Sequence, residues 1–160
     1  MALSCSFTGH REISERHKDK IVGLIGRAIA YAYGEGCRNF YLGGALGFDT
    51  LAAQEVLRFK LMHPDITLNF VLPCVDQSDR WGGQDVSMYE YLLSRADTVE
   101  YTSDCYKKGC MRIRNARLAE LCDIMIAYVG HDRSGASQTV GIATRLGKRV
   151  YNLFPTLDRE

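Results

Sequence analysis

The segment Ile124-Met125-Ile126-Ala127-Tyr128-Val129 is a continuous apolar run. A strand with one face in water alternates apolar and polar residues, whereas a strand buried on both faces does not. Unbroken runs of this length are typical of parallel sheets that helices cover on both sides. The run therefore predicts a central strand inside an α/β domain.

Shorter strands and amphipathic helices alternate along the rest of the chain, with no repeat, low-complexity tract or linker between them. The pattern predicts one domain over residues 1–160, built on a mostly parallel sheet of about six or seven strands with helices on both faces. Strands are expected at residues 2–7, 39–42, 66–72, 98–101, 124–129 and 149–154. Helices are expected after an N-cap at Ser14 and at about residues 50–62, 89–96, 111–121 and 137–146.

Composition narrows the class of protein. The 20 Lys and Arg residues and 19 Asp and Glu residues give a net charge of +1, which argues against a dedicated, sequence-independent nucleic-acid binder. No apolar segment is long enough for a membrane span, and no secretory signal is visible. The six cysteines include no Cys-x-x-Cys pair. They predict reduced thiols in a cytoplasmic protein, with pairing of Cys105 and Cys110 as the alternative.

Ligands of parallel α/β sheets bind beyond the carboxyl ends of the strands, so each loop that follows a strand is a candidate site. These loops also hold the unusual parts of the sequence, which is the first evidence for a function. The candidate loops are residues 8–11, 43–49, 73–83, 102–109 and 130–136.

The glycine-rich stretch from Gly43 to Asp49 joins a predicted strand to a predicted helix. Glycines permit positive φ and close approach of a ligand, and the start of the helix offers free N–H groups to an anion. This predicts a phosphate cradle. The alternative is a tight turn with Asp49 as an ordinary N-cap. The stretch lacks both the dinucleotide-binding fingerprint and a Walker lysine.

Residues 130–139 form a second loop of this kind, in which Gly135, Ser137 and Thr139 supply backbone and hydroxyl donors at a helix start. The alternative is a capped helix with a flexible loop before it. Two such loops in one small domain favour a ligand that carries phosphate.

Several charged and aromatic side chains flank these loops. Arg112, Arg114 and Asn115 lie at a helix start, where basic residues oppose the helix dipole and suit phosphate or carboxylate instead. His10 and Arg11 follow the first strand. Trp81 and Phe48 are candidates for stacking on a base. Neither a metal site nor a known catalytic motif is present, and Asp49 is the most plausible carboxylate of the site.

Four motifs together resemble the YpsA-like family of unknown function, in the SLOG superfamily of Rossmann-like domains that includes DprA (Smf) and the LOG enzymes. The motifs are Phe7-Thr8-Gly9-His10-Arg11, Gly43-Gly44-Ala45-Leu46-Gly47-Phe48-Asp49, Pro73-Cys74 with Gln77 and Trp81, and Arg112-Ile113-Arg114-Asn115. The resemblance implies a single-domain, Rossmann-like three-layer sandwich.

The resemblance also implies a nucleotide or nucleotide-derived ligand, bound for sensing or regulation. One alternative is a LOG-like nucleoside-monophosphate N-glycosidase, with Asp49 or Asp132 in place of the LOG glutamate, whose position here holds Thr139 or Val140. The other is a DprA-like module that binds single-stranded DNA. Pairing through helices into a homodimer is a further expectation. The residues expected to hold ligand or phosphate are Gly9, His10, Arg11, Gly43, Gly44, Gly47, Asp49, Arg112, Arg114, Asn115, Gly135, Ser137 and Thr139.

Overall fold

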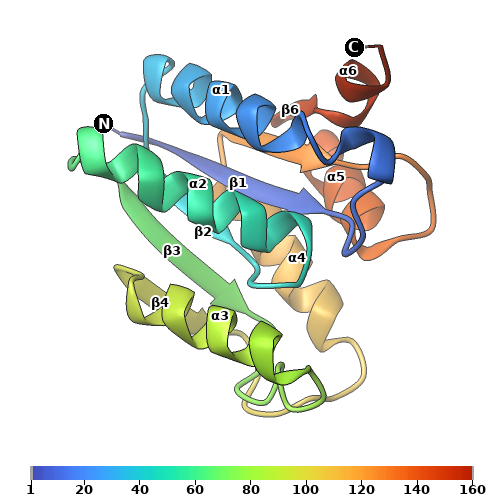
Figure 1. Ribbon diagram of the computed structural model, residues 1–160. Coiled ribbons are helices and arrows are strands. Elements are labelled where there is room, and N and C mark those ends of the chain that lie inside the picture. The colour runs from blue at the N-terminus through green and yellow to red at the C-terminus, as the bar shows by residue number, and fades with distance from the viewer. Residues whose placement is uncertain (1, 160) are drawn as a thin grey trace.

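The computed structural model describes residues 2–159 and contains one six-stranded sheet in which every neighbouring pair of strands is parallel. The strand order is β4-β3-β2-β1-β5-β6 (Figure 1). The strands are β1 (Leu3–Gly9), β2 (Cys37–Leu42), β3 (Thr67–Leu72), β4 (Thr98–Tyr101), β5 (Ile124–Tyr128) and β6 (Arg149–Asn152).

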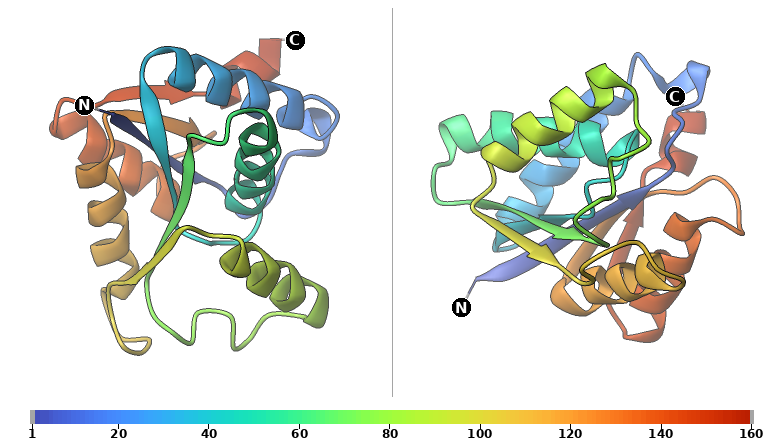
Figure 2. Two further views of the ribbon diagram at one scale, coloured as in Figure 1. Left: turned by 90° about the vertical axis from the view of Figure 1, so that its left-hand side faces the viewer. Right: turned by 90° about the horizontal axis from the view of Figure 1, so that it is seen from below.

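Helices cover both faces of this sheet, which makes a three-layer sandwich. Helices α1, α2 and α3 lie on one face, and α4 and α5 lie on the other (Figures 1 and 2). A short helix, α6, packs near the 3₁₀ turn η1. The bounds are η1 (Glu15–His17), α1 (Ile21–Gly34), α2 (Phe48–Met62), α3 (Gly83–Ser94), α4 (Cys110–Leu121), α5 (Gly135–Arg145) and α6 (Phe154–Arg159).

The strand order reverses between β1 and β5. The chain runs outward from β1 to β4, then returns to β5 on the other side of β1. Because parallel crossovers are right-handed, this reversal moves the connecting helices from one face of the sheet to the other. The loops after β1 and β5 therefore separate, and a crevice opens between them at the carboxyl edge of the sheet.

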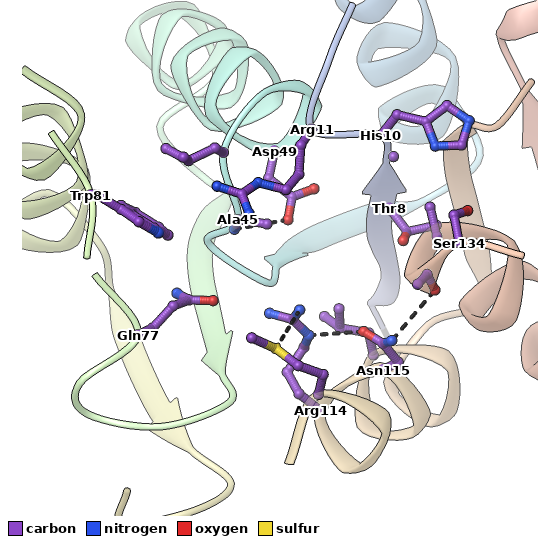
Figure 3. Close-up of a pocket in the computed structure, with 16 residues that line it drawn as sticks. Thr8, His10, Arg11, Ala45, Asp49, Gln77, Trp81, Arg114, Asn115 and Ser134 are labelled. Atoms are coloured by element: carbon purple, nitrogen blue, oxygen red, sulfur yellow. Dashed lines mark hydrogen bonds between the residues drawn. The ribbon is translucent and has the colours of Figure 1, made fainter. Parts of the chain in front are cut away.

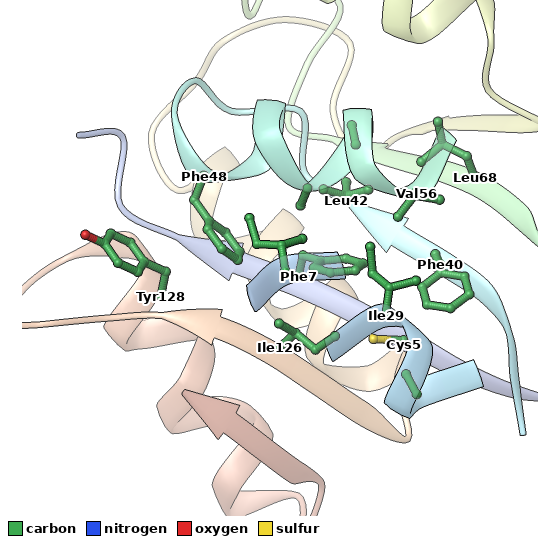
Figure 4. Packing of buried hydrophobic residues seen from close by; sticks show 14 of the residues in the cluster. Cys5, Phe7, Ile29, Phe40, Leu42, Phe48, Val56, Leu68, Ile126 and Tyr128 are labelled. Atoms are coloured by element: carbon green, nitrogen blue, oxygen red, sulfur yellow. The ribbon is translucent and has the colours of Figure 1, made fainter. Parts of the chain in front are cut away.

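The main core lies between the sheet and the layer of α1 and α2 (Figure 4). Phe7, Phe40 and Phe48 are completely buried there, with Ile29 on the inward face of α1. Burying each such side chain contributes about 1.5–3 kcal/mol. A smaller cluster joins α4 and α5 to β5, and Met125 lies within it. All five residues of β5 are buried, as its apolar run predicts.

The fold class is confirmed, with differences at the ends of elements. The first helix begins at Ile21 rather than after Ser14, whose side chain makes no capping bond. The segment before Ile21 is mostly polar, so it forms only a 3₁₀ turn. Helix α6 was not predicted, and it shortens the last strand. All six cysteines are free thiols, and Cys105 is exposed whereas Cys110 is buried.

No helix within residues 2–159 combines the length and the apolar character that crossing a membrane requires.

Candidate functional site

A cavity of about 340 Å³ lies at the point where the strand order reverses. Its walls come from the end of β1, the turn before α2, the loop after β3, the first turns of α4 and the start of α5 (Figure 3). Asp49 and Arg114 lie on opposite sides of it, with Trp81 and Gln77 at one end and His10 and Ser134 at the other. Other lining residues are Thr8, Gly9, Arg11, Ala45, Leu46, Met111, Asn115, Leu118, Gly135 and Ala136.

The turn between β2 and α2 directs the start of α2 toward this cavity. Gly47 has φ 80° and is the N-cap of the helix. A Cβ atom at Gly47 would overlap the backbone of Arg11, and Phe48 N–H donates to the carbonyl of His10 at 3.1 Å. The glycine is therefore needed because two loops of the site pass very close to each other.

Asp49 is not the N-cap of α2, because it lies inside the first turn. Its Oδ2 accepts a hydrogen bond from Ala45 N–H at 3.2 Å. The residue is only 5% exposed, and its Oδ1 is buried without a hydrogen-bond partner in the described structure. Burial raises the pKa of Asp49 to about 6, although attraction to Arg114 and the Ala45 bond lower it. A buried acceptor without a hydrogen-bond partner costs free energy, and a donor group of a ligand would offset that cost.

Arg114 is 7% exposed and connects three walls of the cavity. Its Nη1 donates to the carbonyl of Gly43, and its Nε donates to Asn115 Oδ1 at 2.9 Å. Asn115 Nδ2 in turn donates to the carbonyl of Gly135 at 3.4 Å. Nη2 contacts only the Met111 sulfur within the described residues, at 3.7 Å, and a thioether is a weak acceptor. The guanidinium is thus held rigidly while one of its nitrogens stays available.

Burial lowers the pKa of Arg114, and the Asp49 carboxylate opposes that shift. In the described structure, no guanidinium nitrogen of Arg114 lies within 4.0 Å of an Asp49 carboxylate oxygen, so the two side chains make no ion pair. Their opposite charges face each other across the cavity, and the space between them is available to a ligand.

The ends of the cavity differ in character. His10 Nε2 accepts a hydrogen bond from Gly130 N–H at 2.8 Å, so its proton sits on Nδ1. Burial and then the neighbouring His131 lower the pKa of His10, which keeps the ring neutral near pH 7. At the other end Trp81 packs edge-on against Tyr89, and Gln77 Nε2 donates to Tyr89 Oη at 3.1 Å and to the carbonyl of Gly44.

The structure gathers many of the predicted site residues around this cavity. Thr8 and Gln77, which belong to the motifs of the family resemblance, also line it. Met111 and Leu118 were not predicted, whereas Ser134 and Ala136 belong to the predicted candidate loop 130–136. The predicted residues that line it are Gly9, His10, Arg11, Asp49, Trp81, Arg114, Asn115 and Gly135.

Phe48 is not a stacking face, because it is fully buried. Its ring packs parallel to that of Tyr128 at 5.8 Å. It also fills the space beside Gly9, where a Cβ atom would collide with the Phe48 ring. Phe48 is a core residue that forces glycine at the end of β1.

Within the predicted cradle from Gly43 to Asp49, Gly43 and Gly44 do not line the cavity, whereas Ala45, Leu46 and Asp49 do. A Cβ atom at Gly43 would collide with the Arg114 guanidinium, and one at Gly44 with Leu72. Thr139 is fully buried, and its hydroxyl donates to the carbonyl of Gly135 at 2.9 Å. These residues shape the walls of the site from behind.

Arg112, Ser137 and Asp132 lie on a neighbouring open groove instead of the cavity. Helical spacing explains the separation, because Arg112 and Arg114 project from different sides of α4. Ser137 forms a reciprocal capping box with Ser134, as the capped-helix alternative required. Asp132 is exposed and outside the cavity, which removes it as a catalytic candidate there.

A buried network next to the site could not be seen in the sequence. His17 is completely buried, with Nδ1 at 2.7 Å from Tyr128 Oη and Nε2 at 2.6 Å from Asp158 Oδ1. Tyr128 Oη also accepts from Ser14 N–H at 3.1 Å. The three side chains join η1, β5 and α6, and thereby anchor the segment that follows Arg11.

Residues 7–145 match the YpsA model, described as the YspA SLOG family. The chain belongs to this family. A UPF0398 protein of Halalkalibacterium halodurans is 28% identical over 104 residues, which are 64% of this chain and 55% of that protein. A UPF0398 protein of Bacillus thuringiensis is 24% identical over 120 residues, 74% of this chain and 65% of its own length. The chain therefore spans less than two thirds of these relatives.

Two solved structures share the fold of this YpsA-family chain. One is DNA processing protein A of Helicobacter pylori, which binds single-stranded DNA, with a TM-score of 0.67 and 21% identity over 92% of this chain and 63% of that one. The other is DprA of Streptococcus pneumoniae, with a TM-score of 0.66 and 18% identity over 94% of this chain and 50% of that one. At these identities the likeness concerns the fold.

Proposed function

We propose that this protein binds a nucleotide or nucleotide-derived ligand in the cavity between Asp49 and Arg114. The observation that carries the proposal is the buried, unpartnered Oδ1 of Asp49 in a cavity whose opposite wall holds a fixed guanidinium. A carboxylate accepts hydrogen bonds, whereas a guanidinium donates them. The cavity thus suits a ligand with hydroxyl or amino donors at one point and an anionic group at another.

A nucleotide has these features. Its ribose hydroxyls or base amino group would donate to Asp49, and its phosphate would accept from Arg114 and Arg11. The starts of α2 and α5 both line the cavity, and helix N-termini favour anions. Trp81 provides an aromatic face at one end, which is suited to a base. A volume of about 340 Å³ lies within the range of small-molecule sites.

Calorimetric titration with nucleoside mono-, di- and triphosphates, dinucleotides and ADP-ribose tests the proposal. We expect at least one compound to bind. Arg11→Ala should weaken its binding about tenfold, because Arg11 is exposed and no other described residue pairs with it. Arg95→Ala is the matched control, since Arg95 is also exposed and unpaired in residues 2–159 but lies at the end of α3 outside the cavity. A panel without any binding, or equal losses in both variants, would contradict the proposal.

A second candidate function is hydrolysis of the N-glycosidic bond of a nucleoside monophosphate. The observation in its favour is the pKa of Asp49, about 6, which suits a group that exchanges protons near neutrality. Its test is release of free base from nucleoside monophosphates by the wild type and by Asp49→Asn. Release that is absent, or that persists in Asp49→Asn, would exclude this role for Asp49.

A further inference from the structure

A groove of about 550 Å³ runs along one side of α5, next to the cavity. Its floor is one side of α5, where residues three and four positions apart face the same way. These residues are Ser134, Gly135, Ser137, Gln138 and Gly141. Gly141 and the serines are small, which keeps the floor hollow. Ser134 and Gly135 line both this groove and the cavity, so the two spaces meet at the start of α5.

Three arginines line the groove without partners. Arg112 comes from α4, Arg133 from the loop after β5, and Arg145 from the end of α5. All three are exposed, and none makes a hydrogen bond or ion pair with another residue in the described range 2–159. Asp132 also lines the groove and offsets one of the three charges.

Five other arginines of the chain are paired with carboxylates, whereas within residues 2–159 Arg11 and Arg95 are not. Arg16, Arg38, Arg58, Arg117 and Arg149 each contact a carboxylate within 4.0 Å. Unpaired guanidinium groups that gather on one groove repel each other, and such an arrangement favours an anion with several oxygens.

The backbone at Arg133 adds a second observation. Arg133 has φ 64°, and it is the only residue other than glycine with positive φ in the described chain. An L-residue in this conformation costs about 1–2 kcal/mol relative to ordinary backbone, and glycine would avoid that cost. Position 133 therefore has a backbone conformation that favours glycine, yet it holds an arginine.

We infer that this groove is a second anion subsite, which binds a further phosphate group of the ligand whose nucleotide part occupies the cavity. The inference rests on the proposed function. The N–H groups of Gly135 and Ala136 have no acceptor within α5. Gly135 lines both spaces, and Ala136 lines the cavity next to it. A phosphate linkage at this point would accept hydrogen bonds from those N–H groups, and it would extend toward the arginines. The substrate class is therefore a nucleotide extended by a second phosphate-bearing unit.

The test compares a nucleoside monophosphate with a dinucleotide joined by a pyrophosphate, each titrated into the wild type and into Arg112→Gln/Arg133→Gly/Arg145→Gln. The variant should fold normally, because the three side chains are exposed and the glycine relieves the positive φ. We expect the dinucleotide to lose roughly 10- to 100-fold in affinity, and the monophosphate to change by less than about twofold. Arg95→Gln is the control for charge alone.

A short single-stranded oligonucleotide is the third probe, because a phosphodiester strand brings the same charge to the groove. The probe that loses more affinity in the variant identifies the source of the phosphate. Unchanged dinucleotide and oligonucleotide affinities, with the monophosphate still bound, would overturn this inference alone. Absence of binding to the wild type by every nucleotide of the panel, the dinucleotide included, would overturn the proposed function and this inference together.

Discussion

Replacing Asp49 by asparagine should stabilise the protein near neutral pH. Asparagine has the shape of the protonated aspartate and can keep the bond from Ala45 N–H, but it carries no charge. Burial raises the pKa of Asp49 from an ordinary value of 3.8 to about 6. The folded protein thus binds this proton more tightly than the unfolded chain, and ionisation of Asp49 opposes folding.

The magnitude follows from the difference between the two pKa values. At about 1.4 kcal/mol per pKa unit, the cost of the ionised carboxylate is about 3 kcal/mol. A raised pKa in the folded state means that stability is fully present below about pH 4 and is lost as pH rises through about 6. Asp49→Asn should therefore match the wild type at pH 4 and exceed its free energy of unfolding by about 1–3 kcal/mol at pH 7.5.

Urea denaturation followed by circular dichroism at both pH values measures this difference. Asp97→Asn is the matched control with the opposite sign. Burial of Asp97 raises its pKa, but bonds from Lys60 and from Leu68 N–H outweigh this effect and lower it. Asp97→Asn should therefore lose stability at pH 7.5. If Asp49→Asn is no more stable than the wild type at pH 7.5, the reasoning about the buried carboxylate is wrong.

Three further predictions concern the residues that hold the site together. Arg114→Ala should lower the free energy of unfolding by about 3–5 kcal/mol in urea titrations at pH 7.5, because it removes the bonds to Gly43 and Asn115 and the positive charge that attracts the buried Asp49 carboxylate, and adding Asp49→Asn should restore part of the loss. Tyr128→Phe should cost about 1–3 kcal/mol in the same assay and speed amide exchange in α6, because it breaks the bonds from the Tyr128 hydroxyl to Ser14 and His17, and His17 in turn bonds Asp158 of α6; unchanged exchange would exclude such an anchor. Gly47→Ala should cost several-fold more than Gly109→Ala in thermal unfolding, because both glycines have positive φ but only Gly47 has backbone beside it; equal losses would contradict the close approach of the two loops.

The fold could be predicted from local patterns. The apolar run Ile124–Tyr128 indicates a buried parallel strand wherever it occurs, and the alternation of strands and helices then fixes the layers. The edge of the sheet that holds the candidate site follows from the same pattern, since strand ends in a parallel sheet meet there. Helix ends were less predictable, because Ser14 has the right residue type but no apolar face follows it directly.

The roles of individual site residues could not be predicted, because they depend on contacts between distant parts of the chain. Position 43 requires glycine because the guanidinium of Arg114, 71 residues away, donates to its carbonyl and fills the space that a Cβ atom would need. Phe48 lies in a glycine-rich loop, which suggests an exposed aromatic ring that contacts a ligand. In the structure its ring is enclosed by Tyr128 and Gly9. The unpartnered Oδ1 of Asp49 is visible only once its surroundings are known.

Trp81 gives the most direct measurement of the central claim, that a nucleotide-type ligand occupies the cavity. It is the only tryptophan in the chain and it lines the cavity, so an occupant must change its surroundings. Its fluorescence, excited at a wavelength the nucleotides do not absorb, would be followed during titration with the panel above, with free tryptophan amide as the control for absorption. We predict a saturable change in intensity or wavelength with at least one nucleotide, weakened in Arg11→Ala. Fluorescence that follows the free amide for every compound would contradict the claim.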